Sequence, residues 1–426
     1  MKSPIDGLQR QRSIYLQGIS GIKPSLPISL LELEKEAKKI MSPEAFAYVA
    51  TGAANGETVK RNRTAFQQFH VVPRMLKDVS DRKIAQTILG QEFSYPLFLS
   101  PVGVLEMADK KADLAVAAAA EATRTPYIFS SQASVPMEKV AKMMPYTPKW
   151  FQLYWSKSNE LVASFVKRAE DCGCSAIVVT LDTTLLGWRT MDLDLAYSPF
   201  LRGMGIAQYT SDPVFQQLIH EERPENPNDP PRKINLKAIS TLFAQARNIP
   251  GGFFQNLRSG KSIKSVQAFT HYFVRPNLNW ENLEFLKSVT KLPIILKGII
   301  HPDDAQLAID YGVQGIIVSN HGGRQVEGSV STFEMLPSIV ERVGGKIPVM
   351  MDSGIRSGSD MMKAVAKGAL ATGIGRPYMY ALALSGQKGV EEVILNLKAD
   401  FELNMSLSGC ASLQDIRSAT FVEDKT

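Results

Sequence analysis

Residues 293–320 read PIILKGIIHPDDAQLAIDYGVQGIIVSN, and this stretch decides the fold. Two short apolar runs, 293–298 and 315–320, enclose a segment, 302–312, whose apolar residues recur at helical spacing. Both runs are apolar on both faces, which is typical of strands buried in a parallel sheet. The stretch therefore predicts two parallel strands joined by a helix.

The same alternation extends along the chain in both directions. Further helical segments include 112–122, 159–171 and 357–368. Six more apolar runs are PLFLSP (96–101), YIFSS (127–131), WFQLY (150–154), AIVVTLD (176–182), PVMMDSG (348–354) and ATGIG (371–375). Eight β/α units in succession predict an α/β protein with a closed (β/α)8 TIM barrel rather than an open sheet. The GxGxxG dinucleotide fingerprint is absent after the first of these strands.

The interval between the fourth and fifth predicted strands is much longer than the others. It contains a Pro/Asn-rich stretch, RPENPNDPPRK (223–233), and the segment GGFFQN (251–256). Long insertions after a barrel strand commonly carry function. We expect an insertion at about 195–278 that acts as an active-site lid, with a Pro/Asn-rich middle that is a candidate for disorder.

The pattern changes near residue 95, where we expect the barrel to begin. Residues 1–95 should form an N-terminal arm, helices and a small hairpin that pack on the barrel, which spans 96–426. The first 28 residues are polar and interrupted by proline and glycine. They predict an arm over the surface or over a neighbouring subunit.

Two capping signals follow the arm. Ser29 and Glu32 have the spacing of a capping box before the amphipathic segment 30–40. Ser42 followed by Pro43 is typical of a capped helix start with proline at the first helical position.

Composition excludes several classes of protein. The net charge of +6 is spread over 426 residues without a basic cluster, so no nucleic-acid partner is expected. Three cysteines cannot form a disulfide framework or a four-ligand zinc site, so no metal is expected and a reducing compartment is favoured. No apolar run approaches the ~18–20 residues of a membrane helix, and no secretory signal or peroxisomal tripeptide is visible. These features predict a cytoplasmic protein.

Polar residues stand where most of the predicted strands end. In a barrel these ends meet at the face that carries the active site. They are Ser130, Ser131, Gln152, Tyr154, Thr180, Asp182, Lys297, Ser319, His321, Asp352 and Arg376.

The last two β/α units have the features of a phosphate site. DSGIRSG (352–358) and GIGRP (373–377) offer glycine-rich turns together with Arg356 and Arg376. Barrels often bind a phosphate in the loops after strands seven and eight. The alternative is that these glycines serve tight turns only.

His321 is the candidate base. It follows a buried strand, and Asp182 at the end of another strand is the best-placed carboxylate to orient its ring. Arg324, three residues later, and Arg189 could each clamp a carboxylate through two parallel N–H bonds. The sequence alone therefore predicts a polar site for a phosphorylated ligand and an acid substrate.

These residues also carry a family resemblance. SNHGGRQ (319–325), FQLYW (151–155), VTLDTTLLGWR (179–189), LKGI (296–299), DSGIRSG and GIGRP resemble the FMN-dependent L-2-hydroxy-acid oxidase family over about residues 24–418. The resemblance implies bound FMN, a small 2-hydroxy acid and O2 as reactants, and a homotetramer or larger homo-oligomer.

The resemblance also implies roles for individual residues. His321 would be the catalytic base with Asp182 as its partner. The substrate would be bound by Tyr48, Tyr154, Arg189 and Arg324. FMN would be bound by Pro101, Val102, Gly103, Ser130, Gln152, Thr180, Lys297, Ser319, Asp352, Gly354, Arg356, Gly375 and Arg376.

Within the family, segments such as SPVGV (100–104) and KGIIHPDDA (297–305) resemble the lactate 2-monooxygenase branch. This predicts oxidative decarboxylation of an L-lactate-like acid to the shorter acid, CO2 and water. Gly103 should leave room of about one methyl group beside the flavin. The alternatives are a simple oxidase that releases the 2-oxo acid and H2O2, a flavin barrel acting on a peptide or another electron acceptor, a non-catalytic homologue, and a phosphate-binding barrel without flavin.

Two positions depart from the family pattern. Gln132 stands where glycolate-oxidase-like members carry tryptophan, which leaves the favoured substrate side chain open. Ser353 replaces the first glycine of the Asp-Gly-Gly found in many of these oxidases.

Overall fold

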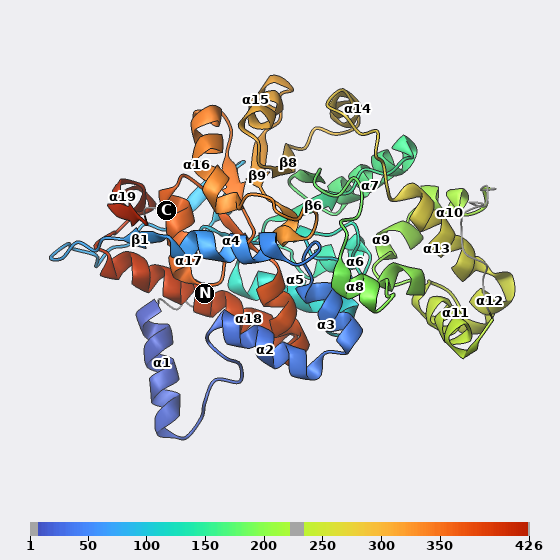
Figure 1. Ribbon diagram of the computed structural model, residues 1–426, viewed down its shortest axis with the longest axis horizontal. Helices are drawn as coiled ribbons and strands as arrows, with labels where there is room; N and C mark the ends of the chain where they lie inside the picture. Colours follow the sequence, from blue (N-terminus) through green and yellow to red (C-terminus); the bar gives the residue numbers. More distant parts are fainter. Residues whose placement is uncertain (1–6, 222–233, 425–426) are drawn as a thin grey trace.

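A closed barrel of eight parallel strands forms the centre of the protein (Figure 1). The structure is a computed structural model that describes residues 7–221 and 234–424. The barrel strands are β4 (Leu97–Leu99), β5 (Tyr127–Phe129), β6 (Lys149–Leu153), β7 (Ile177–Thr180), β8 (Ile294–Ile299), β9 (Gly315–Val318), β10 (Val349–Met351) and β11 (Thr372–Ile374). Neighbours in the chain are neighbours in the barrel, and β11 pairs with β4 to close it. The predicted (β/α)8 barrel is confirmed.

Helices follow the strands around the outside of the barrel. They are α5 (Ala112–Thr123), α6 (Met137–Lys142), α7 (Asn159–Asp171), α14 (Asn282–Val289), α15 (Pro302–Asp310), α16 (Thr332–Val343), α17 (Gly358–Ala366) and α18 (Arg376–Leu407), with short 3-10 turns η1 (Leu105–Met107) and η3 (His321–Gly323). Their apolar faces pack on strands that are buried at nearly every position, as the sequence pattern predicted.

The inside of the barrel is filled at its N-terminal end. A hairpin of β2 (Gln86–Ile88) and β3 (Gln91–Phe93) places Ile88 and Phe93 in one buried cluster with inward-facing strand residues such as Phe98 and Trp150. The Phe93 and Trp150 rings lie 5.8 Å apart. Because this end is filled with apolar side chains, the polar strand ends at the opposite face are left to form a site.

Between the N-terminal arm and the barrel lie the helices α2 (Leu30–Ile40), α3 (Pro43–Ala50) and α4 (Glu57–Gln67). The Ser42 side chain caps α3 by accepting the Ala45 N–H at 3.1 Å. Ser29 stands at the N-cap of α2 but makes no capping bond, and the Glu32 carboxylate accepts from Lys35 instead. The predicted capping box is therefore wrong, because a competing ion pair on an exposed helix holds the glutamate.

The N-terminal arm contains a helix that the sequence pattern did not predict, α1 (Gly7–Ile19). It packs against α18, where the Gly7 N–H donates to Glu402 and Arg10 pairs with Glu392 and Asn396. Its stability therefore depends on tertiary contacts rather than on local pattern.

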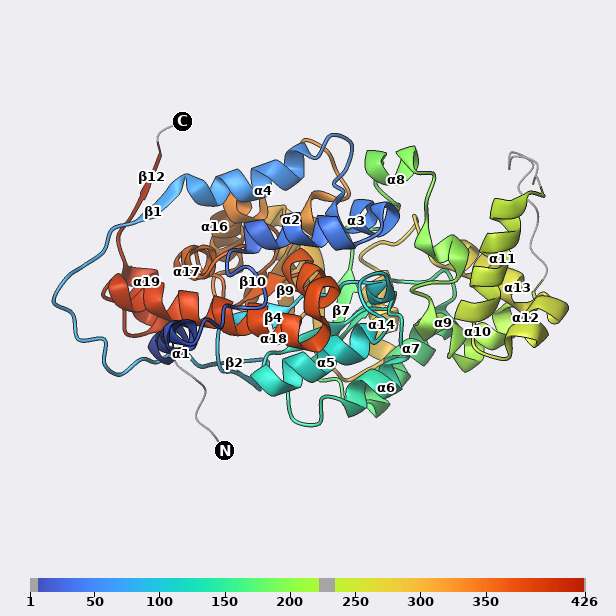
Figure 2. The same ribbon diagram turned by 90° about the horizontal axis from the view of Figure 1, so that it is seen from below.

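The long insertion between β7 and β8 is mostly helical. It contains α8 (Thr190–Asp194), η2 (Pro199–Arg202), α9 (Ala207–Thr210), α10 (Pro213–Leu218), α11 (Leu236–Asn248), α12 (Phe253–Ser259) and α13 (Lys261–Tyr272). Figures 1 and 2 both show α10–α13 grouped at one side of the barrel, far from α1. The Pro/Asn-rich stretch 223–233, named above as a candidate for disorder, lies outside the described residues.

The last strand of the chain pairs with a strand that precedes the barrel, at the side away from this insertion (Figure 1). Strand β1 (Phe69–Val71) pairs antiparallel with β12 (Phe421–Glu423), which follows the short helix α19 (Leu413–Ser418). Among residues 7–221 and 234–424, no helix has both the length and the apolar character needed to cross a membrane. Cys172, Cys174 and Cys410 are free thiols.

Candidate active site

A cavity opens at the C-terminal ends of the barrel strands, where about 1100 Å³ of space, its open mouth included, is not filled by protein atoms. The predicted site residues line this cavity, except Asp182, Gln152 and Ser319. Each of these three is hydrogen-bonded to a residue that does line it.

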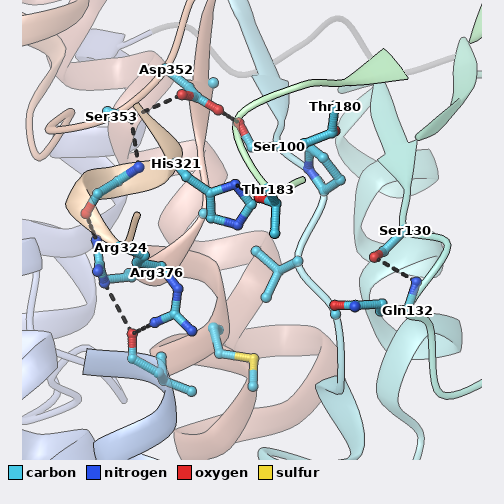
Figure 3. A pocket seen from close by; sticks show the side chains of 18 of the residues that line it. Ser100, Ser130, Gln132, Thr180, Thr183, His321, Arg324, Asp352, Ser353 and Arg376 are labelled. Carbon is cyan, nitrogen blue, oxygen red and sulfur yellow. Dashed lines mark hydrogen bonds between the residues drawn. The ribbon is translucent and has the colours of Figure 1, made fainter. Parts of the chain in front are cut away.

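His321 lines the cavity (Figure 3), and Asp182 is hydrogen-bonded to its imidazole ring. His321 Nδ1 lies 2.7 Å from Asp182 Oδ1, and the Thr183 hydroxyl lies within 3.1 Å of both groups. The carboxylate favours the tautomer with the proton on Nδ1, which leaves the lone pair on Nε2. Nε2 has no hydrogen-bond partner among the residues that the structure describes. It is therefore the nitrogen available to a ligand.

The protonation states follow from burial and charge. Burial lowers the pKa of His321 below its ordinary value, against the raising effect of the Asp182 carboxylate. Burial alone would raise the pKa of Asp182, but the charges of His321 and Lys297 and the hydrogen bonds to it lower its pKa to about 2. At neutral pH this pair consists of a neutral imidazole and a carboxylate, which is the state a general base requires.

Lys297 lies behind the pair in a buried polar cluster. Its Nζ donates to Ser319 Oγ at 2.7 Å and lies 3.4 Å from Asp352 Oδ2 and 3.8 Å from Asp182 Oδ2. Burial opposes the charge, but the two carboxylates outweigh it and raise the pKa of Lys297. Lys297 is thus a fixed positive charge inside the barrel.

Gly298 explains how Asp182 comes so close to β8. The β8–β9 register shifts at this point, and Gly298 has a φ of +110°. A Cβ there would lie 2.9 Å from the Asp182 Cβ. Only glycine allows this approach.

The arginines of the site are anchored to the C-terminal end of α3. Arg324 Nη1 donates to the carbonyls of Tyr48 (2.7 Å) and Thr51 (3.1 Å), and Arg376 donates to those of Val49 (3.0 Å) and Thr51 (2.8 Å). Helix C-terminal carbonyls lack partners within the helix and attract cations. The contacts explain how α3 places Tyr48 in the cavity.

The substrate-binding candidates converge from four parts of the chain. Arg324 lies over the Tyr48 ring at 5.2 Å from its centroid, and Tyr154 follows β6. Arg189, which is 8% exposed, donates to Gln325 Oε1 at 2.9 Å. Burial and the nearby Arg189 lower the pKa of Arg324 to about 9, so an anion bound here would be stabilised.

The loops after β10 and β11 form the other end of the cavity. Burial and the nearby Arg376 lower the pKa of Arg356 to about 10. Among the described residues, no carboxylate pairs with the guanidinium of Arg356 or Arg376. A Cβ at Gly375 would touch only Val102, at 3.5 Å, so the backbone there faces open space. Half-buried guanidinium groups without a carboxylate partner, beside exposed backbone, suit a phosphate group such as that of FMN.

Ser353 has a role that its sequence position did not reveal. It has a φ of +78°, a conformation that favours glycine. Its hydroxyl donates to Asp352 Oδ1 and accepts the Gly322 N–H, both at 3.0 Å. These two bonds compensate for the strained backbone and join the loops after β9 and β10.

The prediction that Gly103 leaves room for a methyl group is wrong. A Cβ at Gly103 would lie 2.8 Å from the Cβ of Gln132, so that space is already filled. Sequence reasoning also missed Thr183, Ser100 and Phe200, which line the cavity. The hydroxyl directly after Asp182 was a usable signal, whereas nothing local marked Phe200 in the insertion.

Comparison with known proteins agrees with this geometry. Residues 37–423 match the family model described as FMN-dependent dehydrogenase. The chain is 39% identical to an L-lactate oxidase of Lysinibacillus sphaericus, over 96% of each chain, and 33% identical to human 2-hydroxyacid oxidase 1, over 91% of this chain and 95% of the relative. A crystal structure of mandelate oxidase superposes with a TM-score of 0.75 at 32% identity, over 94% of this chain and 100% of that one.

No group of three or more metal-ligating side chains is arranged for a metal ion within the described part of the chain. The cavity instead combines a histidine, a buried lysine and two glycine-rich loops that carry arginines, and this set of groups fits a flavin mononucleotide. The match to the family model covers most of the chain. The protein therefore belongs to the FMN-dependent dehydrogenase family and is an FMN-dependent oxidoreductase of the 2-hydroxy-acid oxidase and dehydrogenase kind.

Proposed function

We propose that this enzyme oxidises small L-2-hydroxy acids to 2-oxo acids, with O2 as the final electron acceptor and H2O2 as the second product. The observation that carries the proposal is the neutral His321 held by Asp182 in one cavity with Arg189 and Arg324. This arrangement provides a proton acceptor beside a site for a carboxylate, as oxidation of a 2-hydroxy acid requires. The names of the relatives support the same substrate class.

Each protein group has a distinct task in this reaction. Arg324 and Arg189 bind the substrate carboxylate, and Tyr48 and Tyr154 position its hydroxyl. His321 Nε2 accepts a proton, from the hydroxyl in a hydride mechanism or from C2 in a carbanion mechanism, and Asp182 stabilises the imidazolium.

Bound FMN supplies the two-electron acceptor. Arg356, Arg376 and the backbone at Gly354 and Gly375 would hold its phosphate, and Pro101–Gly103, Ser130 and Thr180 would surround its ring. The remaining predicted contacts, from Gln152, Ser319, Asp352 and Lys297, complete the polar side of the site. Lys297 would offset negative charge on the reduced cofactor.

The predicted decarboxylating outcome gives way here to the simple oxidase. The relatives named above are oxidases. Gly103 does not favour a monooxygenase, because the space that a side chain would take there is already filled by Gln132. We therefore propose release of the 2-oxo acid before it reacts with peroxide.

The insertion at about 195–278 is proposed as the lid of the site. Support comes from Phe200 of η2, which lines the cavity and meets the Tyr48 ring edge-on at 6.3 Å. A homotetramer or larger assembly and a cytoplasmic location stay predictions.

Product analysis tests the proposal. The purified holoenzyme is incubated with L-lactate in air, and pyruvate, acetate and peroxide are quantified together. Equal amounts of pyruvate and peroxide are expected. Acetate with little free peroxide would establish the monooxygenase instead, and no oxidation of any L-2-hydroxy acid would refute the function.

A further inference from the structure

Gln132 is a buried amide on the wall of the active-site cavity. It follows β5, lines the cavity and is 7% exposed. Its backbone is held on both sides, because its N–H donates to Ser130 Oγ at 3.0 Å and its carbonyl accepts the Val104 N–H at 2.9 Å. In Figure 3 its side chain extends into the cavity toward the side occupied by His321 and Arg324.

The side chain of Gln132 is also fixed in place by its neighbours. A Cβ on Gly103 would lie 2.8 Å from the Gln132 Cβ and 3.4 Å from its Oε1. On the insertion side, a Cβ on Gly205 would lie 3.1 Å from the Gln132 carbonyl oxygen. The absence of side chains at Gly103 and Gly205 therefore allows two loops to pack closely against Gln132. This close packing restricts the amide to conformations that face the cavity.

The Gln132 amide has no hydrogen-bond partner among residues 7–221 and 234–424. Apolar side chains, among them Val102, Phe200 and Met379, also line the cavity. Because the amide faces the cavity and makes no bond within the described residues, it is available to bind a ligand or water there. The amide can both donate and accept, which matches a hydroxyl group.

We propose that the enzyme prefers L-2-hydroxy acids that carry a hydroxyl on the third carbon, and that the Gln132 amide binds this hydroxyl. The inference rests on the proposed function. With the carboxylate on Arg189 and Arg324 and C2 beside His321, the rest of the substrate extends toward the opposite wall, where Gln132 lies. A neutral amide selects a hydroxyl over a second carboxylate, which would require another cation.

An isosteric pair of substrates tests the proposal. L-glycerate and L-2-hydroxybutyrate differ only by a hydroxyl in place of a methyl group. The kcat/KM of the wild-type holoenzyme should be about tenfold higher for L-glycerate than for L-2-hydroxybutyrate, because sites built around a hydroxyl discriminate against analogues that lack it. A wild-type preference for L-2-hydroxybutyrate, or equal values, would overturn the inference without any variant.

The variant Gln132→Met keeps the length of an unbranched side chain and removes the amide. We expect the ratio of kcat/KM for L-glycerate to kcat/KM for L-2-hydroxybutyrate to be about tenfold lower in the variant than in wild type. Comparing this ratio between the two proteins cancels any intrinsic difference in reactivity between the substrates. An unchanged ratio would mean that the amide does not contact the substrate.

L-lactate separates this inference from the proposed function. Anaerobic reduction of the flavin by L-lactate, in wild type and variant, shows that the base and carboxylate site work. If L-lactate reduces the flavin and the selectivity is absent, only the role of Gln132 fails. If no L-2-hydroxy acid reduces the flavin, the function itself fails.

Discussion

His321 is held in an unusual backbone conformation, with a φ of +56°, and Gly322 and Gly323 after it also have positive φ. Such strain is tolerated at functional sites when surrounding contacts fix it. Here Asp182 and Thr183 hold the ring, and the Gly322 N–H donates to Ser353. The conformation places the imidazole in the cavity rather than along the strand.

His321→Ala should abolish reduction of the flavin by substrate while FMN stays bound, because the phosphate loops are formed by other residues. Loss of a general base commonly lowers the rate by ~10²–10⁴-fold. Anaerobic stopped-flow absorbance measures both properties. Flavin reduction by L-lactate at a near-normal rate would show that another group accepts the proton.

The pH dependence of flavin reduction should reflect the same residue. His321 must be neutral to act as base, so the rate falls as pH decreases through its pKa, which burial places below 6.5. Asp182→Asn removes a carboxylate that raises this pKa. The variant should therefore be slower and should lose activity only at still lower pH. A shift of the acid limb to higher pH would contradict the assignment.

At the scale of elements, the short helix α3 links the N-terminal segment to the site. Its C-terminal carbonyls accept hydrogen bonds from Arg324 and Arg376, and it carries Tyr48. The cap at its other end, Ser42, was predicted from sequence and is confirmed. The stability of this helix should therefore affect the substrate site.

Two serines provide a matched test of helix capping. Ser42→Ala removes a capping bond and should reduce the free energy of unfolding by about 1 kcal/mol. Ser29→Ala serves as the control, because Ser29 occupies an N-cap without accepting such a bond, and it should change stability little. Urea denaturation of both variants under the same conditions gives the comparison. Equal destabilisation would show that the cap bond of α3 contributes nothing measurable.

At the scale of the whole molecule, the cavity is lined by loops that follow the first barrel strand in the sequence, the last one and strands between them. Its wall runs from Pro101 after β4 to Arg376 after β11, and Tyr48 joins it from outside the barrel. A ligand that contacts all of these residues stabilises the folded state as a unit. Binding at 100 times Kd adds about 2.7 kcal/mol to the free energy of unfolding.

Flavin-free protein should therefore be stabilised by added FMN, which we expect to recover from the native enzyme on denaturation. Riboflavin lacks the phosphate and cannot bind to Arg356 and Arg376 through it, so at equal concentration it should stabilise the protein much less. Thermal unfolding of the flavin-free form with each compound measures the difference. Equal stabilisation by the two compounds would place the phosphate site elsewhere.

The sequence by itself determined the barrel and most of its site. The apolar runs of buried strands and the spacing of the helices are local patterns, and each of the eight predicted runs overlaps a barrel strand. Once the strands are parallel neighbours, their polar ends must meet at one face. That is why the strand pattern was enough to assign residues as distant in sequence as Ser130, His321 and Arg376 to one site.

Only the tertiary structure decided which groups contact one another. Helix α1 depends on contacts with α18, and Glu32 pairs with Lys35 instead of completing a capping box. Gly103 and Gln132 belong to loops that follow two different strands. Their close approach shows that Gly103 is needed to make room for Gln132 and does not leave free space beside the flavin. Side-chain periodicity encodes the direction in which a residue faces, whereas the distance to a partner from another loop is set by the packing of the whole barrel.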